Sequence, residues 1–285
     1  MRKKYLALFK KQKREIQKIY SDICNWLKRR LKRYNEDTLT EKDLMDIKKE
    51  LEKEFRGSAI KIASVIDSNL NVVSNMSYSV NTDFFKSIDK RYGTNLLGNY
   101  KKAVEGVNDK VKDKIKNGEV YKSDFRLSEK IWGSNKKTIE DINKIIDIGI
   151  KEKKNPYAIA KDLEKYVNPK EKKDYKWSNK YPGSNKVVDY NAQRLATTSI
   201  THAHQISMME YAKSNRFITY LQYNSSGGNA CDLCMGRDGE LFLKDETPLD
   251  HPNGRCFMTL HIPDNFEDLI LDYINSDDFY LDLDE

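Results

Sequence analysis

Phe217-Ile218-Thr219-Tyr220-Leu221-Gln222-Tyr223 is the stretch at which this 285-residue chain changes from residues that favour helix to residues that favour strand. Its β-branched and aromatic residues favour a strand. The residues before it, from about Val188 to Ser214, have the spacing of a helix. After it, Asp238-Gly239 is a turn signal, and residues 256–262 favour another short strand. The sequence therefore predicts an α+β fold whose C-terminal module combines a helix with a small antiparallel sheet.

The first two thirds of the chain favour helix. Apolar residues at three- and four-residue spacing predict one amphipathic helix over residues 2–34. A second helix is expected from Thr40, a good N-cap residue, towards Ile66, with less clear helical signals to about Lys116. Asn155-Pro156 predicts the start of a further helix, with an N-cap followed by proline at the first helical position.

These patterns suggest three parts. We expect a helical arm over residues 1–130, a compact module over residues 131–263 and an acidic tail over residues 264–285. A stretch rich in Lys, Asn, Ser and Pro, residues 168–186, is the best candidate for a linker. No apolar run approaches the roughly 18 residues of a membrane span, and the N-terminus lacks the apolar core of a secretory signal. We therefore expect no membrane association and a protein made in a cytoplasm.

Charge is distributed unevenly. Residues 1–34 contain 13 Lys and Arg against two acids, and residues 264–285 contain nine acids and no base. One interpretation of the basic run is a solvated helix face. The other is an arm that contacts nucleic acid or an acidic partner, with Arg29, Arg30, Lys32 and Arg33 meeting phosphates without sequence preference.

Three of the four cysteines fall close together, as Cys231-x2-Cys234 and, after sixteen intervening residues, His251-x4-Cys256. A two-residue gap lets two thiolates from one turn reach a single ion, and the second motif supplies two more ligands. Three Cys and one His predict structural zinc, and they leave no open position for a catalytic water. The alternative is a group of buried, reduced thiols with His251 held by a backbone hydrogen bond. Cys24 is expected to face the core as a small apolar residue.

The remaining chemistry-bearing residues lie on the helix before the strand. His202 and His204 are two residues apart, so they point to different sides of it, and we expect them to hydrogen-bond to the loops that follow. Arg194 is expected in a structural ion pair. A nuclease or other nucleic-acid-processing enzyme using these three residues is the alternative. The sequence contains neither a phosphate-binding glycine loop nor a nucleophile elbow, which argues against an enzyme.

The last third of the chain resembles the phage head-morphogenesis family, also called the Mu-F-type minor head proteins. The blocks that carry the resemblance occur in the family's order across about residues 130–263. They are a predicted helical segment with Trp132 near its start, residues 155–163, residues 194–203, Cys231-x2-Cys234 with Arg237-Asp238-Gly239, and residues 248–256. Two positions depart from the family. Thr197 and Ser199 replace the Arg and Glu of a common A-R-T-E block, and Gly254 replaces the first cysteine of H-P-N-C-R-C. The first change removes charged residues that catalysis would use, and the second leaves Cys256 as the single fourth ligand.

The resemblance implies a structural minor capsid protein of a tailed bacteriophage. Such a protein is present in few copies, lies in the capsid interior near the portal vertex, and acts in head assembly and in DNA packaging or ejection. Its implied partners are the portal protein, the major capsid protein and packaged DNA, with the host cytoplasm as its location during assembly. No catalytic residue is expected.

Overall fold

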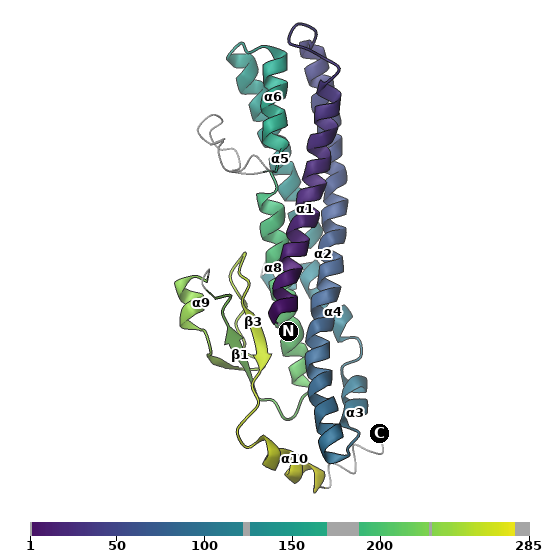
Figure 1. The fold of residues 1–285 in the computed structure, drawn as a ribbon, viewed down its shortest axis with the longest axis vertical. Helices are drawn as coiled ribbons and strands as arrows, with labels where there is room; N and C mark the ends of the chain where they lie inside the picture. Colours follow the sequence, from purple (N-terminus) through teal and green to yellow (C-terminus); the bar gives the residue numbers. More distant parts are fainter. Residues whose placement is uncertain (1, 122–125, 170–187, 228–229, 277–285) are drawn as a thin grey trace. The chain divides into compact units, whose positions relative to one another are not determined.

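The computed structural model describes residues 2–121, 126–169, 188–227 and 230–276 (Figure 1). The chain divides into two compact units. The helical unit comprises Leu8–Ile66 and Phe125–Ala196, and the mixed unit comprises Met1–Ala7, Asp67–Asp124 and Thr197–Glu285. This division does not follow the three consecutive parts expected from the sequence, because each unit is assembled from segments far apart in the chain. Most of the predicted linker, from residue 170 onward, lies outside the described residues.

The elements follow one another along the chain as helices with one small sheet near the end. They are α1 (Arg2–Leu31), α2 (Glu41–Tyr92), α3 (Leu96–Ala103), α4 (Val107–Asn117), the 3-10 turn η1 (Glu119–Tyr121), α5 (Leu127–Lys151), α6 (Pro156–Val167), α8 (Tyr190–Lys213), β1 (Tyr220–Asn224), α9 (Asp232–Gly236), β2 (Leu241–Leu243), β3 (Phe257–Leu260) and α10 (Phe266–Ile274). The predicted α+β class is confirmed, with helix predominating.

Local signals set the helix boundaries. Thr40 and Asp43 form a reciprocal cap at the start of α2: the Asp43 amide donates to Thr40 Oγ1 (3.2 Å), and the Thr40 amide donates to Asp43 Oδ2 (3.1 Å). The Asn155 side chain accepts from the Tyr157 amide (2.8 Å) at the start of α6, as predicted. The extent of α2 differs from the prediction, because its 52 residues continue without a break to Tyr92.

The helical unit has an apolar core with a few buried polar contacts. On α1, the apolar residues at three- and four-residue spacing are buried from Phe9 to Leu31, and Cys24 lies among them with 3 % of its surface exposed, which confirms its expected role. Asn135 on α5 donates to the Phe55 carbonyl (2.6 Å), and Tyr166 on α6 donates to Asp141 Oδ2 (2.9 Å). Buried polar groups that are paired in this way fix which residues of neighbouring helices meet.

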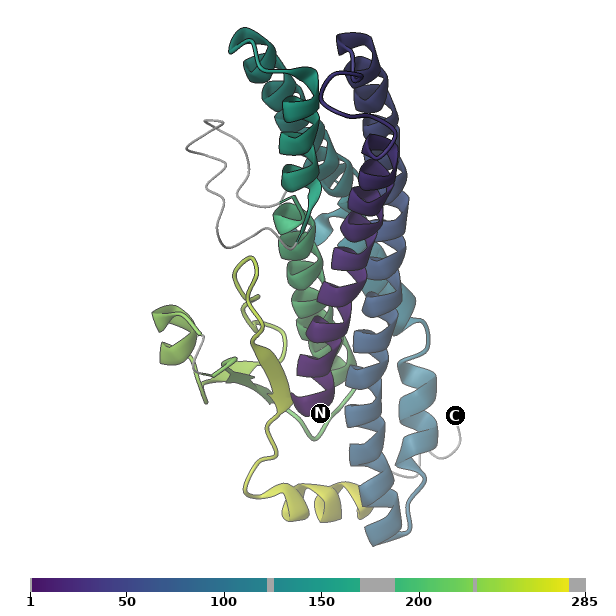
Figure 2. The ribbon, with the colours of Figure 1, turned by 45° about the horizontal axis from the view of Figure 1, so that its top comes forward.

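The mixed unit contains a three-stranded antiparallel sheet in the order β2-β1-β3. Leu221 pairs with both Phe242 and Leu260, which fixes the register on either side of β1. The first turn of α1 lies beside β3 in both views (Figures 1 and 2), where the Tyr5 ring contacts that of Phe257 at 5.9 Å between centroids. Helix α10, which the sequence analysis did not anticipate within the acidic tail, buries Ile270 and Tyr273 in the core of this unit.

Candidate metal centre

The two cysteines of the C-x2-C motif lie on one helical turn. Cys231 is the N-cap of α9 and is exposed, whereas Cys234 lies within the helix and is 2 % exposed. The Met235 amide closes the turn on the Cys231 carbonyl (2.9 Å). The turn directs both sulfur atoms to the same side, where they lie within 4.8 Å of each other and of a ligand atom of His251.

His251 faces this pair across a short gap. Its Nε2 lies 3.4 Å from Cys231 Sγ, within the roughly 3.3–4 Å that separates ligands of a tetrahedral zinc ion. Its Nδ1 lies 3.1 Å from the Pro252 carbonyl, so Nδ1 carries the proton in that hydrogen bond. In the neutral ring this leaves the lone pair on Nε2, the nitrogen directed at the thiols.

Cys256 joins the cluster through Cys234. Cys234, Cys256 and Asp250 form a second set whose ligand atoms all lie within 4.8 Å of one another, and all three residues are buried. The structure thus brings the four predicted ligands into one cluster of two triads that share Cys234. Asp250 is a fifth possible donor that sequence reasoning missed, and its only signal was its place directly before His251.

Helix α8 holds the loop that carries His251. Four of its side chains, spaced so that they share one face of the helix, bond to the backbone of residues 250–254. The Asp250 carbonyl lies 2.8 Å from His202 Nε2, the Asp250 amide donates to Gln205 Oε1 (2.9 Å), the Asn253 amide donates to Thr198 Oγ1 (2.9 Å), and Thr201 Oγ1 donates to the Gly254 carbonyl (2.7 Å). The predicted bond from His202 to a following loop is confirmed.

His204 occupies a different environment. Its Nδ1 lies 3.0 Å from Ser77 Oγ on α2, and its ring contacts Tyr5 at 4.8 Å between centroids. Burial lowers the pKa of His204 to about 4, so the ring is neutral at physiological pH. The two histidines therefore point to different sides of the helix, as predicted, but the partner of the His204 Nδ1 is on the earlier helix α2 and not in a following loop, the position expected for both. Arg194 is exposed and belongs to the helical unit.

The thiols differ in how easily they ionise. The Cys234 amide, the Cys234 thiol and nearby His251 together hold the pKa of Cys231 below its usual value. Burial raises the pKa of the Cys234 and Cys256 thiols. The hydrogen bond to the Pro252 carbonyl, followed by the charges of Asp250 and Cys231, raises the pKa of His251. A divalent cation would offset the cost of forming thiolates at the two buried positions, since ligating thiols are deprotonated by the ion.

Of the four basic residues predicted to contact nucleic acid, Arg29 and Arg30 lie in the last turn of α1, and Lys32 and Arg33 lie in the turn that follows it, all in the helical unit. Arg29, Lys32 and Arg33 are exposed, and Arg30 Nε lies 3.5 Å from Glu50 Oε2. Positive side chains also stabilise the C-terminal end of a helix through its dipole. The structure is compatible with both interpretations of this basic run.

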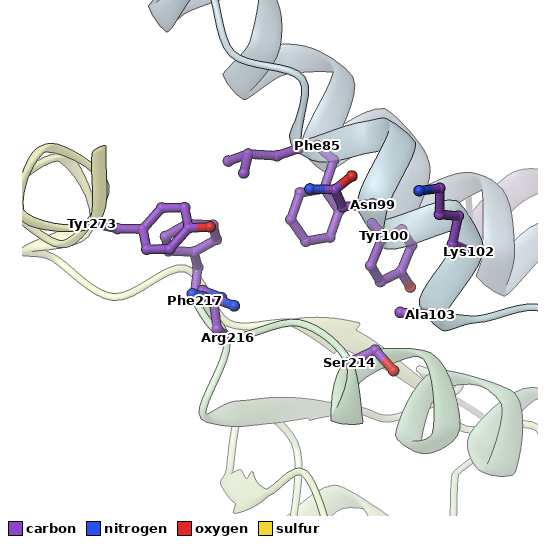
Figure 3. A pocket seen from close by; sticks show the side chains of 10 residues that line it. Phe85, Asn99, Tyr100, Lys102, Ala103, Ser214, Arg216, Phe217 and Tyr273 are labelled. Atoms are coloured by element: carbon purple, nitrogen blue, oxygen red, sulfur yellow. The ribbon is translucent and has the colours of Figure 1, made fainter. Parts of the chain in front are cut away.

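A separate cavity of about 360 Å³ lies in the mixed unit (Figure 3). Phe85 and Tyr100 stack on one side, with ring centroids 4.3 Å apart, and Phe217 and Tyr273 lie opposite. The Arg216 guanidinium lies 4.3 Å from the Tyr273 ring centroid. The described residues that line this cavity include no cysteine or histidine, so it is not part of the metal cluster.

Comparison of the chain with protein-family models, curated proteins and solved structures gave no significant match. Within the part of the chain that the structure describes, no helix has the combination of length and apolar character that crossing a membrane requires.

Proposed function

We propose that this protein is structural rather than enzymatic and that its Cys/His cluster holds a zinc ion. The observation that carries the proposal is the convergence of Cys231, Cys234 and His251, whose ligand atoms lie within 4.8 Å of one another. Soft sulfur donors with one imidazole suit zinc better than harder cations, and Cys256 is the fourth ligand. When bound, the ion would link α9 to the loop before β3 and so stabilise this part of the mixed unit.

Metal analysis of the purified chain tests this site. We expect one zinc per chain, lost in Cys231→Ser and in His251→Gln. Cys24→Ala removes a thiol from the helical unit and is the matched control, with zinc content unchanged. Chelation should increase hydrogen exchange in residues 231–260 while leaving exchange in α5 and α6 unaltered. A wild-type chain without zinc, or variants that keep it, would overturn the proposal.

We infer further that the protein is a minor head protein of a tailed bacteriophage, located in the virion near the portal. The inference rests on the resemblance of its sequence blocks, and one contact supports it: the block around His202 and the block that contains His251 pack together through the bonds between α8 and residues 250–254. Cryo-electron microscopy of the virion or prohead would test it, and density for this chain away from both portal and capsid shell would refute it.

The basic end of α1 is proposed to contact packaged DNA. Replacement of Arg29, Arg30, Lys32 and Arg33 by Gln should reduce the slope of log affinity against log salt by about 3.6, since each phosphate contact contributes about 0.9. Replacement of Lys10, Lys11, Lys13 and Arg14 by Gln removes the same charge from the same helix and is the control, with a smaller effect. Equal slopes in the two variants would exclude a specific role for residues 29–33. Loss of portal binding with unchanged DNA affinity would favour docking on an acidic protein surface.

The nuclease alternative has little support from the site. His202 is 5 % exposed and His204 is 1 % exposed, and the two contact different elements, so they do not present a shared open surface for proton transfer. Incubation with single-stranded DNA, duplex DNA and RNA, with and without magnesium, should give no cleavage above background. Cleavage abolished by His202→Ala or by His204→Ala in a folded chain would establish the enzyme instead.

A further inference from the structure

The carboxylate of Asp250 is buried at the centre of the cluster. Its side chain is 0 % exposed, so a charged group at this position requires hydrogen-bond donors. The His251 amide donates to Oδ1 (2.8 Å), and the Cys256 amide donates to Oδ2 (2.9 Å). The Cys234 thiol lies 3.4 Å from Oδ1. One carboxylate therefore contacts three of the residues that supply candidate ligands.

The backbone amide and the backbone carbonyl of Asp250 are both held by hydrogen bonds as well. Its amide and carbonyl are held by Gln205 and His202 on α8, so the backbone that presents the carboxylate has little freedom. Because the His251 amide and the Cys256 amide bond to opposite oxygens of one side chain, the chain between them is closed into a compact loop. That loop places His251 Nε2 beside Cys231 and the Cys256 sulfur beside Cys234.

Gly254 leaves the space that the carboxylate occupies. A Cβ built on Gly254 would lie 2.0 Å from Asp250 Oδ2 and 2.2 Å from its Cγ. Any side chain at this position would have to displace the carboxylate, because the Gly254 carbonyl is itself held by Thr201 (2.7 Å) and its amide donates to the His251 carbonyl (2.9 Å). Glycine is therefore required here by close approach and not by a turn conformation.

From this arrangement we infer that Asp250 is the positioning residue of the metal centre, and that Gly254 serves it by leaving room for its carboxylate. The inference rests on the proposed zinc site. Asp250 acts through His251 and Cys256, the residues whose amides it binds, and does not itself bind the metal. Residues that orient metal ligands in this way are typically worth about 10–100-fold in metal affinity.

Cobalt and zinc binding to the full chain test the assignment. Zinc affinity, measured by competition with a chelating dye, should fall by about 10-fold in Asp250→Asn, which keeps one of the two acceptor positions, and by about 100-fold in Asp250→Ala and Gly254→Ala. Asp245→Asn, an exposed acid in the same connection, and Gly57→Ala, where an added Cβ meets nothing within 4 Å, are the matched controls and should bind as wild type does.

The absorption spectrum of bound cobalt separates positioning from ligation. If Asp250 positions the ligands, saturated Asp250→Asn has the spectrum of the wild-type complex. A changed spectrum would show that the carboxylate is itself a ligand and would overturn the inference, as would unchanged zinc affinity in Asp250→Ala. A wild-type chain that binds neither metal would instead refute the proposed zinc site, so the two failures are distinguishable.

Discussion

Acidification should destabilise the mixed unit through His204. The ring is 1 % exposed, and burial lowers its pKa from the ordinary value of 6.5 to about 4. The unfolded chain therefore binds a proton between these values while the folded chain does not, and stability falls as the pH drops through this window. For a single group with these two pKa values, the free energy of unfolding should decrease by about 2.5 kcal/mol between roughly pH 7.5 and pH 4.5.

Urea unfolding followed by circular dichroism measures this effect. It is performed with chelator throughout, so that pH-dependent metal binding does not contribute. His204→Gln lacks the titrating ring, and the quantity of interest is the difference between wild type and variant at each pH. That difference should shrink by about 2.5 kcal/mol on acidification, because only the wild type loses stability through this group. Parallel stability curves for the two proteins over this range would refute the argument.

Three further perturbations follow from individual contacts. Glu210 is 6 % exposed, lies within 3.1 Å of the amino groups of three lysines, and has a pKa lowered to about 2. The stability contributed by its charge should therefore be present above pH 4.5 and lost as the pH falls towards 2. Glu210→Gln should lower the free energy of unfolding by about 2 kcal/mol at neutral pH, and an unchanged urea midpoint would contradict this. Gly149→Ala would place a Cβ 2.6 Å from Ile159 and should lower the free energy of unfolding by about 1–3 kcal/mol. Gly57→Ala, where the added Cβ meets nothing within 4 Å, should be neutral or stabilising. Equal melting temperatures of these two variants would refute the contrast. Asn135→Ala leaves the buried Phe55 carbonyl without its side-chain donor and should cost about 1–3 kcal/mol by thermal melting, unlike exposed Asn25→Ala.

The metal cluster shows which residues of a site could be predicted from the sequence and which could not. The spacing of Cys231 and Cys234 indicated two sulfurs on one turn, and the structure has them there, because the geometry of a single turn depends only on neighbouring residues. Asp250 could not be singled out among 44 acidic residues. Its role depends on donors from α9, α8 and the start of β3, and nothing local to Asp250 encodes their proximity.

Elements that depend on interactions between residues close together in the chain were determined by the sequence alone. The cap at Thr40, the Asn155-Pro156 helix start, the buried stripe of α1 and the strand around Leu221 each depend on residues within a few positions of one another. Hydrogen bonding within a turn and the burial of a periodic apolar face suffice to specify them.

Only the tertiary structure decided which hydrogen-bond partner each of two similar residues has. His202 and His204 are both buried on one helix, yet His202 bonds to a loop 48 residues later and His204 to a helix 127 residues earlier. The same holds for the mixed unit, which combines the start, middle and end of the chain. Partners at such separations are selected by packing of the whole unit, because many alternative pairings satisfy the local pattern equally well and only one fills the core.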